Sequence, residues 1–329
     1  MHLLQICNVG DVCGGTAACA WTITRALPEC QHSVAFLSRV KEETRRHFGH
    51  TRVLEWKQVS PDGVRKLRPD LVLLHNTSEG RGVPIKEVAS IQYLHSAITP
   101  LSAPITVACS QELRSRLELS SRQIGDRVSS VLYQPVPVPP RPTHWTGETR
   151  WLRDRMVVGR ICTPTSRKWP VELIPFYQEL AASCRSIDWE FVGCPTILQD
   201  DLRRACLGRA VFHPASWGAR SHLWRWDAML YHHPTLSETF GRTCAEAMRA
   251  GCIPIVDDRG GFREQVTPKT GLLCRQTSEF VTALMTLQSR SRRWVMQRQA
   301  TQMAHDRFSL QAFSVAFREL LREASGTQS

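Results

Sequence analysis

Two glutamates flank a glycine turn in the second half of the chain. Glu238 and Glu246 belong to the stretch SETFGRTCAEAMRAGCIPIV, residues 237–256, which also contains Gly241. The pattern predicts a turn that carries Glu238, a glycine that lets the backbone approach a ligand, a helix that carries Glu246, and a buried strand. Unpaired N–H groups at the start of such a helix favour an anion, most often a phosphate. Because two glutamates at this spacing also arise by chance, the sequence around them carries the prediction.

With its Phe-Gly pair and the Ala-Met-x-Ala-Gly that follows, this stretch resembles the retaining glycosyltransferases of the GT-B fold, specifically glycosyltransferase family 4, the glycosyl transferases group 1. The resemblance implies that Glu238 holds hydroxyls of the donor sugar and that Glu246 binds the ribose of a nucleotide. It places Thr239, Phe240 and Gly241 at the donor, with the backbone N–H groups of the last two contacting the sugar and a phosphate.

The reaction that the resemblance implies is transfer of a hexosyl or pentosyl group from a nucleotide-diphosphate sugar to an acceptor hydroxyl, with retention at the anomeric carbon. The nucleotide sugar is a co-substrate, and no cofactor or metal is expected. Retaining glycosidases use one of two carboxylates as a nucleophile. The glutamates here are expected to bind the donor instead, while the leaving phosphate accepts the proton of the acceptor.

Further residues fit the same resemblance. Arg160, which ends the run Val157-Val158-Gly159-Arg160, and Lys168 are similar to the family's cations that bind the donor diphosphate. An arginine fork and a lysine point charge stabilise the negative charge that develops as the sugar–phosphate bond breaks. Gly14 and Gly15, after the first expected strand, resemble the glycine pair that lets donor and acceptor approach the N-terminal domain.

Two histidines follow expected strands of the first half. His75 ends the strand at 71–75, Asn76 follows it, and His95 comes directly after the strand at 91–94. Since ligands of parallel sheets bind at the carboxyl ends of the strands, these residues are expected to face the ligand. The resemblance gives His95 a hydrogen bond to the donor sugar. His75 and Asn76 are candidates for contact with the acceptor, and a purely structural histidine fits His75 equally well.

Three polar pairs invite comparison with metal ligands. They are Asp200-Asp201, His232-His233 and Asp257-Asp258. None has a matched partner at ligand spacing, so we expect solvated loop ends and no metal.

Apolar runs alternate with helical stretches along the chain, which predicts an α/β protein of the GT-B type. Two doubly wound Rossmann-like domains are expected to face a cleft. The first, residues 1–140, is completed by a C-terminal helix at 309–325 that crosses back to it, and is expected to bind the acceptor. The second, residues 141–308, is expected to bind the nucleotide sugar. A linker is expected at 134–142, because its five prolines exclude a helix interior and a central strand. The expected strands are 3–7, 33–37, 71–75, 91–94, 105–108, 128–133, 156–162, 189–193, 210–213, 229–232 and 253–257.

Composition narrows the class of protein further. The 329 residues carry a formal net charge of +12, and 42% of them are hydrophobic, which excludes a disordered chain. No apolar run is long enough to cross a membrane, and the short N-terminal run lacks the form of a signal peptide. The twelve cysteines lie singly, so free thiols in a reducing compartment are expected. A cytoplasmic location follows, in a bacterium or a virus-infected host cell.

The acceptor is the open part of the prediction. A saccharide, lipid or metabolite is the common case, and the alternative is a DNA glycosyltransferase of the phage type that acts on a hydroxymethylated base in duplex DNA. Both halves of the chain are basic, which suits DNA or a peripheral contact with an anionic membrane. A minor alternative is a non-catalytic protein that binds nucleotide sugars. Salt-dependent binding of duplex DNA would separate the first two.

Overall fold

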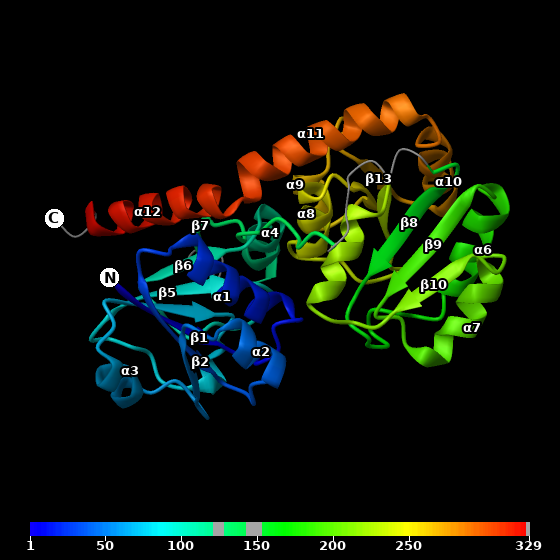
Figure 1. The fold of residues 1–329 in the computed structure, drawn as a ribbon. Helices are drawn as coiled ribbons and strands as arrows, with labels where there is room; N and C mark the ends of the chain where they lie inside the picture. The colour runs from blue at the N-terminus through cyan, green and yellow to red at the C-terminus, as the bar shows by residue number, and fades with distance from the viewer. Residues whose placement is uncertain (121–127, 143–152, 327–329) are drawn as a thin grey trace. The chain divides into compact units, whose positions relative to one another are not determined.

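The computed structural model describes residues 1–120, 128–142 and 153–326. The chain divides into two compact units (Figure 1). Unit 1 is formed by residues 1–136 and 307–329, and unit 2 by residues 137–306. Each unit contains one parallel sheet with helices on both faces.

The sheet of unit 1 has the strand order β3-β2-β1-β4-β5-β6-β7. Because β1 pairs with both β2 and β4, the direction of winding reverses beside β1, and such a point is where doubly wound sheets bind ligands. The strands are β1 (His2–Cys7), β2 (Gln31–Phe36), β3 (Arg52–Glu55), β4 (Leu71–His75), β5 (Ala89–Leu94), β6 (Ile105–Ala108) and β7 (Val128–Val131).

Side chains along β1 alternate between the two faces of the sheet, and each face packs against a different part of the core of unit 1. Leu4 and Ile6 pack with Val64 of one helix, whereas Cys7 packs with Ala17 and Ala20 of another. The helices of this unit are α1 (Gly15–Ala26), α2 (Glu42–His47), α3 (Pro61–Leu67), α4 (Gln111–Ser120) and α12 (Leu310–Gly326), with a 3₁₀ turn η1 (Glu79–Arg81).

The C-terminal helix completes unit 1, as predicted. Helix α12 packs against α1, and Arg318 on α12 bonds to Glu29 at 2.6 Å. Phe313 and Phe317 stack on each other along the buried side of α12. Burial of these rings against the first domain explains why the chain returns to it.

Unit 2 repeats the plan with the strand order β10-β9-β8-β11-β12-β13. Here β8 pairs with both β9 and β11, so the winding reverses beside β8. The strands are β8 (Met156–Ile161), β9 (Ile187–Val192), β10 (Ala210–His213), β11 (Ala228–Tyr231), β12 (Ile253–Asp257) and β13 (Leu272–Cys274).

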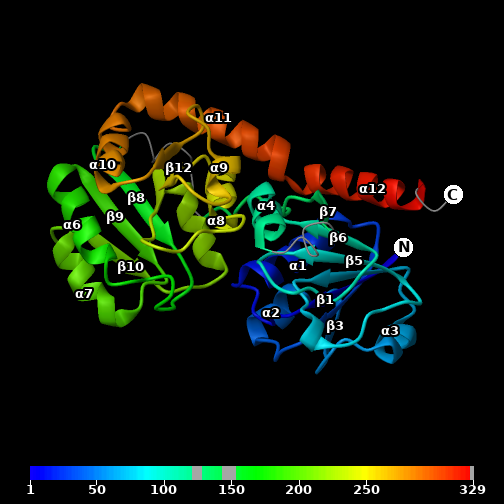
Figure 2. The ribbon, with the colours of Figure 1, turned by 180° about the vertical axis from the view of Figure 1, so that it is seen from behind.

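Two helical layers sandwich this second sheet (Figure 2). Helices α6 (Leu173–Ser183), α7 (Thr196–Ala205) and α10 (Thr277–Thr286) contribute to one large apolar core with the strands. Helix α8 (Arg242–Arg249) contacts α9 (Phe262–Gln265) and the 3₁₀ segment η3 (Gly218–Trp224). Helix α11 (Arg290–Phe308) is the last helix of unit 2, and its final residues, from Arg307 on, belong to unit 1.

The predicted fold class is confirmed: two doubly wound α/β units with a C-terminal helix that returns to the first. Residues 134–142 contain neither helix nor strand. Strands β2, β5 and β9 each begin two residues earlier than predicted, and the short elements α2, α3, α9, β3 and β13 were not predicted. Among the described residues, no helix is long and apolar enough to span a membrane.

Candidate active site

The loop that carries Glu238 lies between β11 and α8 in unit 2. The N–H of Gly261 donates to the carbonyl of Glu238 at 2.8 Å, and the side-chain amide of Gln265 donates to the carbonyl of Phe240. Gly241 precedes α8 with a φ of 79°, and no side chain caps the helix. The contacts of the segment 260–265 therefore hold the backbone of the loop in place, and α8 begins directly after Gly241, as the sequence predicted.

Glu238 is held by two neighbours. Its Oε1 accepts a hydrogen bond from the Tyr231 hydroxyl at 2.7 Å and forms an ion pair with the Lys168 ammonium. Burial alone raises the pKa of Glu238, but the positive charge of Lys168 and the donated hydrogen bonds outweigh it, so the pKa falls below its usual value. The group is therefore an ionised carboxylate suited to accepting hydrogen bonds from hydroxyl groups.

Arg160 is fully buried next to Lys168 and Tyr231. Its Nη1 donates to the carbonyl of His232 and its Nη2 to the carbonyl of Lys168, each at 2.8 Å. The guanidinium also faces the rings of Tyr231 at 4.8 Å and Trp169 at 5.0 Å. Arg160 therefore joins the loop of Lys168 to the end of β11, and it places a buried positive charge beside these residues.

His233 is a part of the site that the sequence analysis missed. Its Nδ1 accepts the N–H groups of Thr235 and Leu236 at 3.2 and 2.7 Å, so its Nε2 carries the proton and donates to the carbonyl of Arg167 at 2.8 Å. Burial lowers the pKa of His233, which keeps the ring neutral in this role. His233 ties the Lys168 loop to the chain that leads to Glu238.

The expectation of solvated loop ends was wrong for two of the three polar pairs. Asp257 is buried: its Oδ1 lies 2.6 Å from His232 Nδ1, and its Oδ2 accepts the N–H of His233 at 2.8 Å. The two pairs end the neighbouring strands β11 and β12, so the sheet order brings them together. Asp200 and Asp201 do lie at the surface, in ion pairs with Arg203 and Arg204.

Glu246 lies on the buried side of α8, and both of its oxygens are paired. Arg242 Nε approaches Oε1 at 3.1 Å, and Arg220 Nε approaches Oε2 at 3.0 Å. The Arg220 guanidinium also covers the ring of Trp217 at 3.9 Å. The carboxylate predicted to bind ribose is thus paired with two arginines and linked through Arg220 to η3.

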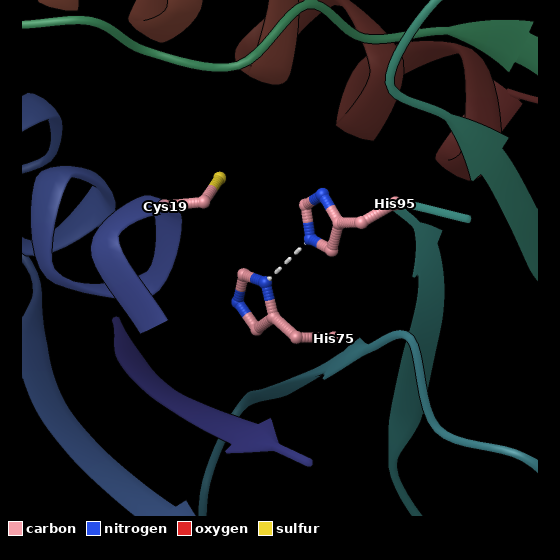
Figure 3. A group of neighbouring side chains, drawn as sticks. All are labelled: Cys19, His75 and His95. Carbon is pink, nitrogen blue, oxygen red and sulfur yellow. Dashed lines mark hydrogen bonds between the residues drawn. The ribbon is translucent and has the colours of Figure 1, made fainter. Parts of the chain in front are cut away.

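The candidate residues of unit 1 meet at the carboxyl ends of β4 and β5. His75 Nδ1 lies 3.1 Å from His95 Nε2 (Figure 3), and His75 Nε2 lies 2.9 Å from Gln5 Oε1. Gln134 Nε2 lies 2.9 Å from His95 Nδ1. The thiol of Cys19 on α1 also faces the two rings.

The partners fix the protons on both rings. Gln5 donates its amide N–H to the carbonyl of Ala20, so its Oε1 can only accept, and His75 must donate from Nε2. His75 Nδ1 then accepts from His95 Nε2, and His95 Nδ1 accepts from Gln134. Both histidines are thereby neutral, and burial lowers the pKa of His75 to about 3. His75 is fully enclosed and acts on its surroundings through His95.

Asn76 and the glycine pair shape the backbone around these rings. Asn76 adopts a φ of 52°, and its Oδ1 accepts the N–H groups of His95 and Ser96, both at 3.0 Å. Gly14 precedes α1, which has no side-chain cap, and a Cβ at Gly15 would meet no atom within 4 Å. The start of α1 therefore offers N–H groups, with open space at Gly15.

We compared the chain with known protein families and with solved structures. Residues 222–301 match the model of the family glycosyl transferases group 1, a match that includes Glu238 and Glu246 and confirms the resemblance found in the sequence. No curated protein matches the chain by sequence.

Solved structures extend the comparison over almost the whole chain. Anabaena HepE in complex with UDP-glucose has a TM-score of 0.76 at 17% identity, covering 98% of this chain and 100% of HepE. Sucrose-phosphate synthase from Thermosynechococcus elongatus has a TM-score of 0.75 at 13% identity, covering 99% and 100%. A glycosyltransferase from Rickettsia africae has a TM-score of 0.73 at 13% identity, covering 98% of each chain. The chain has the GT-B fold.

The loop that carries Glu238 allows a test of the role of Gly241. A Cβ on Gly241 would come within 2.5 Å of the Phe262 ring, in addition to the strain of φ 79°. Gly208 has a similar φ of 76° but no atom within 4 Å of its Cβ position, so it isolates the strain. We expect Gly208→Ala to lower the free energy of unfolding by about 1 kcal/mol, and Gly241→Ala by about 1–3 kcal/mol more. Urea denaturation measures both, and equal losses would contradict the packing argument.

The buried histidine pair gives a second test. Since His75 stays neutral in the folded state down to a pKa of about 3 but binds a proton near pH 6.5 when unfolded, acid favours the unfolded chain. Below pH 6.5 this group should lower the free energy of unfolding by about 1.4 kcal/mol for each pH unit, until pH approaches 3. The variant His75→Gln should lack that part of the slope, while His50→Gln, at an exposed turn, is the control. Parallel stability curves for wild type and His75→Gln would refute the assignment.

Proposed function

We propose that the chain is a retaining glycosyltransferase that moves a hexosyl or pentosyl group from a nucleotide-diphosphate sugar to the hydroxyl of a saccharide, lipid or metabolite, without a metal. The observation that carries the proposal is the ionised Glu238, held between Lys168 and Tyr231 in front of the uncapped start of α8. This arrangement combines an acceptor for sugar hydroxyls with donors for phosphate. The family match over residues 222–301 and the GT-B fold support it.

The donor would be bound by unit 2. Glu238 would hold hydroxyls of the sugar, while the backbone N–H groups near Phe240 and Gly241 and the Lys168 ammonium would receive the phosphates. Thr239 lies in the same loop. Glu246 would accept the ribose hydroxyls, in exchange for part of its pairing with Arg220 and Arg242.

Charge stabilisation is the main contribution that these residues can make. As the sugar–phosphate bond breaks, negative charge grows on the diphosphate, and Lys168 with the start of α8 lies ready to stabilise it. Arg160 acts as a positioning residue, because its guanidinium is buried under Lys168 and holds the carbonyl of that residue. The leaving phosphate then accepts the proton of the acceptor hydroxyl.

Glu238 suits donor binding better than nucleophilic attack. Its Oε1 already accepts one hydrogen bond and one ion pair, and both lower its basicity. Attack by the acceptor from the side of the leaving group retains the anomeric configuration without a glycosyl–enzyme bond. This differs from retaining glycosidases, which form that bond.

Unit 1 would supply the groups that meet the sugar and the acceptor. The His95 ring is held by Gln134 and His75, which fix its orientation. Asn76 sets the backbone that presents His95, and Gly15, which follows Gly14 at the start of α1, leaves open space for a ligand. His75 contributes by orienting His95 from within the core.

The proposal is tested by incubating the protein with labelled nucleotide sugars and a panel of acceptors. The panel contains saccharides, lipid-linked sugars and duplex DNA with a hydroxymethylated base, which also covers the phage-type alternative. We expect a labelled product with the anomeric configuration of the donor, and an initial rate that does not rise on addition of Mg²⁺ or Mn²⁺. Inversion, a rate that requires either ion, or donor binding with neither transfer nor hydrolysis would each overturn the proposal.

Variants of unit 2 give a sharper prediction. Glu238→Ala removes the acceptor for the sugar hydroxyls and Arg160→Ala releases the Lys168 loop, so each should lower turnover by at least about a hundredfold, the scale of one lost transition-state contact. Arg160→Lys keeps the charge but not the fork that binds two carbonyls, so its turnover should also fall. Asp200→Asn, at an exposed ion pair far along α7, is the control and should match wild type. Turnover near wild type in both alanine variants, with folding verified by circular dichroism, would argue against this site.

A further inference from the structure

A second cluster of polar side chains lies in unit 2, apart from the residues assigned to the donor. It consists of Glu190 on β9, His213 at the end of β10 and His222 in η3. Glu190 Oε2 lies 3.5 Å from His213 Nε2 and 3.3 Å from His222 Nδ1. The two imidazole rings face each other with centroids 4.0 Å apart. Three potential ligand atoms from three elements thus converge on one point.

The two histidine nitrogens are buried, and within the described part of the chain neither has a hydrogen-bond partner. They lie close to Glu190 Oε2, but not along the line that a hydrogen bond requires. A buried polar atom without a partner costs about 1–3 kcal/mol, and two such atoms beside one carboxylate oxygen call for an explanation. An ion between the three atoms supplies one, since each nitrogen would then direct its lone pair at the ion.

The two nitrogen-to-oxygen separations, 3.5 and 3.3 Å, are close to those between ligands of a tetrahedral metal. Atoms bound at about 2.0–2.1 Å to one ion with tetrahedral angles lie about 3.3–3.4 Å from one another. Two imidazole nitrogens and one carboxylate oxygen form a set that zinc binds in proteins, with the fourth position left to water. The side chains of His213 and His222 are about one-fifth exposed, at 23% and 19%, so water can reach the cluster.

The surroundings of Glu190 resemble the outer shell of a metal site. Trp226 Nε1 donates to Glu190 Oε2 at 2.8 Å, and Arg225 Nη2 lies 3.2 Å from Oε1. The Trp226 ring packs directly against the backbone at Gly159, where a Cβ would lie only 2.1 Å from the ring. This close packing fixes the ring. Partners that orient a ligating carboxylate in this way strengthen metal binding.

We propose that Glu190, His213 and His222 bind one Zn²⁺ ion. The ion joins η3 to strands β9 and β10. Because η3 also carries Arg220, which pairs with Glu246, the ion holds the segment that contacts the nucleotide side of the site. Its role is structural, so glycosyl transfer itself needs no metal and the two proposals fail separately.

The group formed by Cys19, His75 and His95 in unit 1 is the competing candidate. Its two histidines already use the facing nitrogens for a hydrogen bond to each other, within a series that satisfies every ring nitrogen (Figure 3). It is also fully buried. A metal would have to break that series, which favours the cluster of Glu190.

The test starts from protein freed of metal by a chelator and returned to metal-free buffer. Titration with ZnCl₂ against a chromophoric chelator should show one equivalent bound per chain, and zinc should raise the melting temperature, because it binds only the folded state. The double variant His213→Asn/His222→Asn should lose at least about a hundredfold in affinity. It should also lose the zinc-dependent rise in melting temperature.

Matched controls separate this site from others. The variant His50→Asn/His305→Asn removes two exposed histidines and should bind zinc as wild type does, as should Cys19→Ser. With Co²⁺, the cluster of Glu190 should give no thiolate-to-cobalt absorption, whereas a site at Cys19 would. The proposal is overturned if no stoichiometric binding occurs, if folded His213→Asn/His222→Asn binds zinc normally, or if Cys19→Ser abolishes binding.

Discussion

A single buried guanidinium holds the candidate active site together. Arg160 enters from β8 and donates to carbonyls of two separate loops, at Lys168 and at His232. Removing such a group from water is costly unless hydrogen bonds and aromatic faces compensate, and here both are present. The Lys168 ammonium and the Tyr231 hydroxyl that hold Glu238 both depend on this one side chain. His233 supports the same loop from the other side.

The overall fold was predictable because parallel strands buried on both faces form continuous apolar runs, such as Leu71–His75 and Ile253–Asp257. The same reasoning failed at β3 and β13, which are short and lie at the edges of their sheets. An edge strand buries less apolar surface, and so its sequence carries a weaker pattern. The short helices α2 and α3 lack the length over which a helical period becomes visible.

The site was predictable where a motif specifies local geometry, and not where long-range packing decides. The turn with Glu238, Gly241 and the start of α8 follows from the sequence around it. Arg160 and His233 show the limit, because a polar residue near a strand end points to solvent in one tertiary setting and into the core in another. Nothing local indicated that Asp257 would meet His233, a contact that exists because β11 and β12 are neighbours in the sheet.

The glycine contacts of the donor loop bear on how this protein can be engineered. A side chain on Gly260 or Gly261 would run into the backbone at Glu238, Thr239 or Phe240, at separations of 2.4–2.8 Å. The shape of the loop that carries Glu238 is thus set by Gly260 and Gly261, to which no role in binding or catalysis is assigned. Libraries that aim to change donor preference should leave these glycines fixed and vary Thr239 and its neighbours, since the backbone frame then survives each exchange.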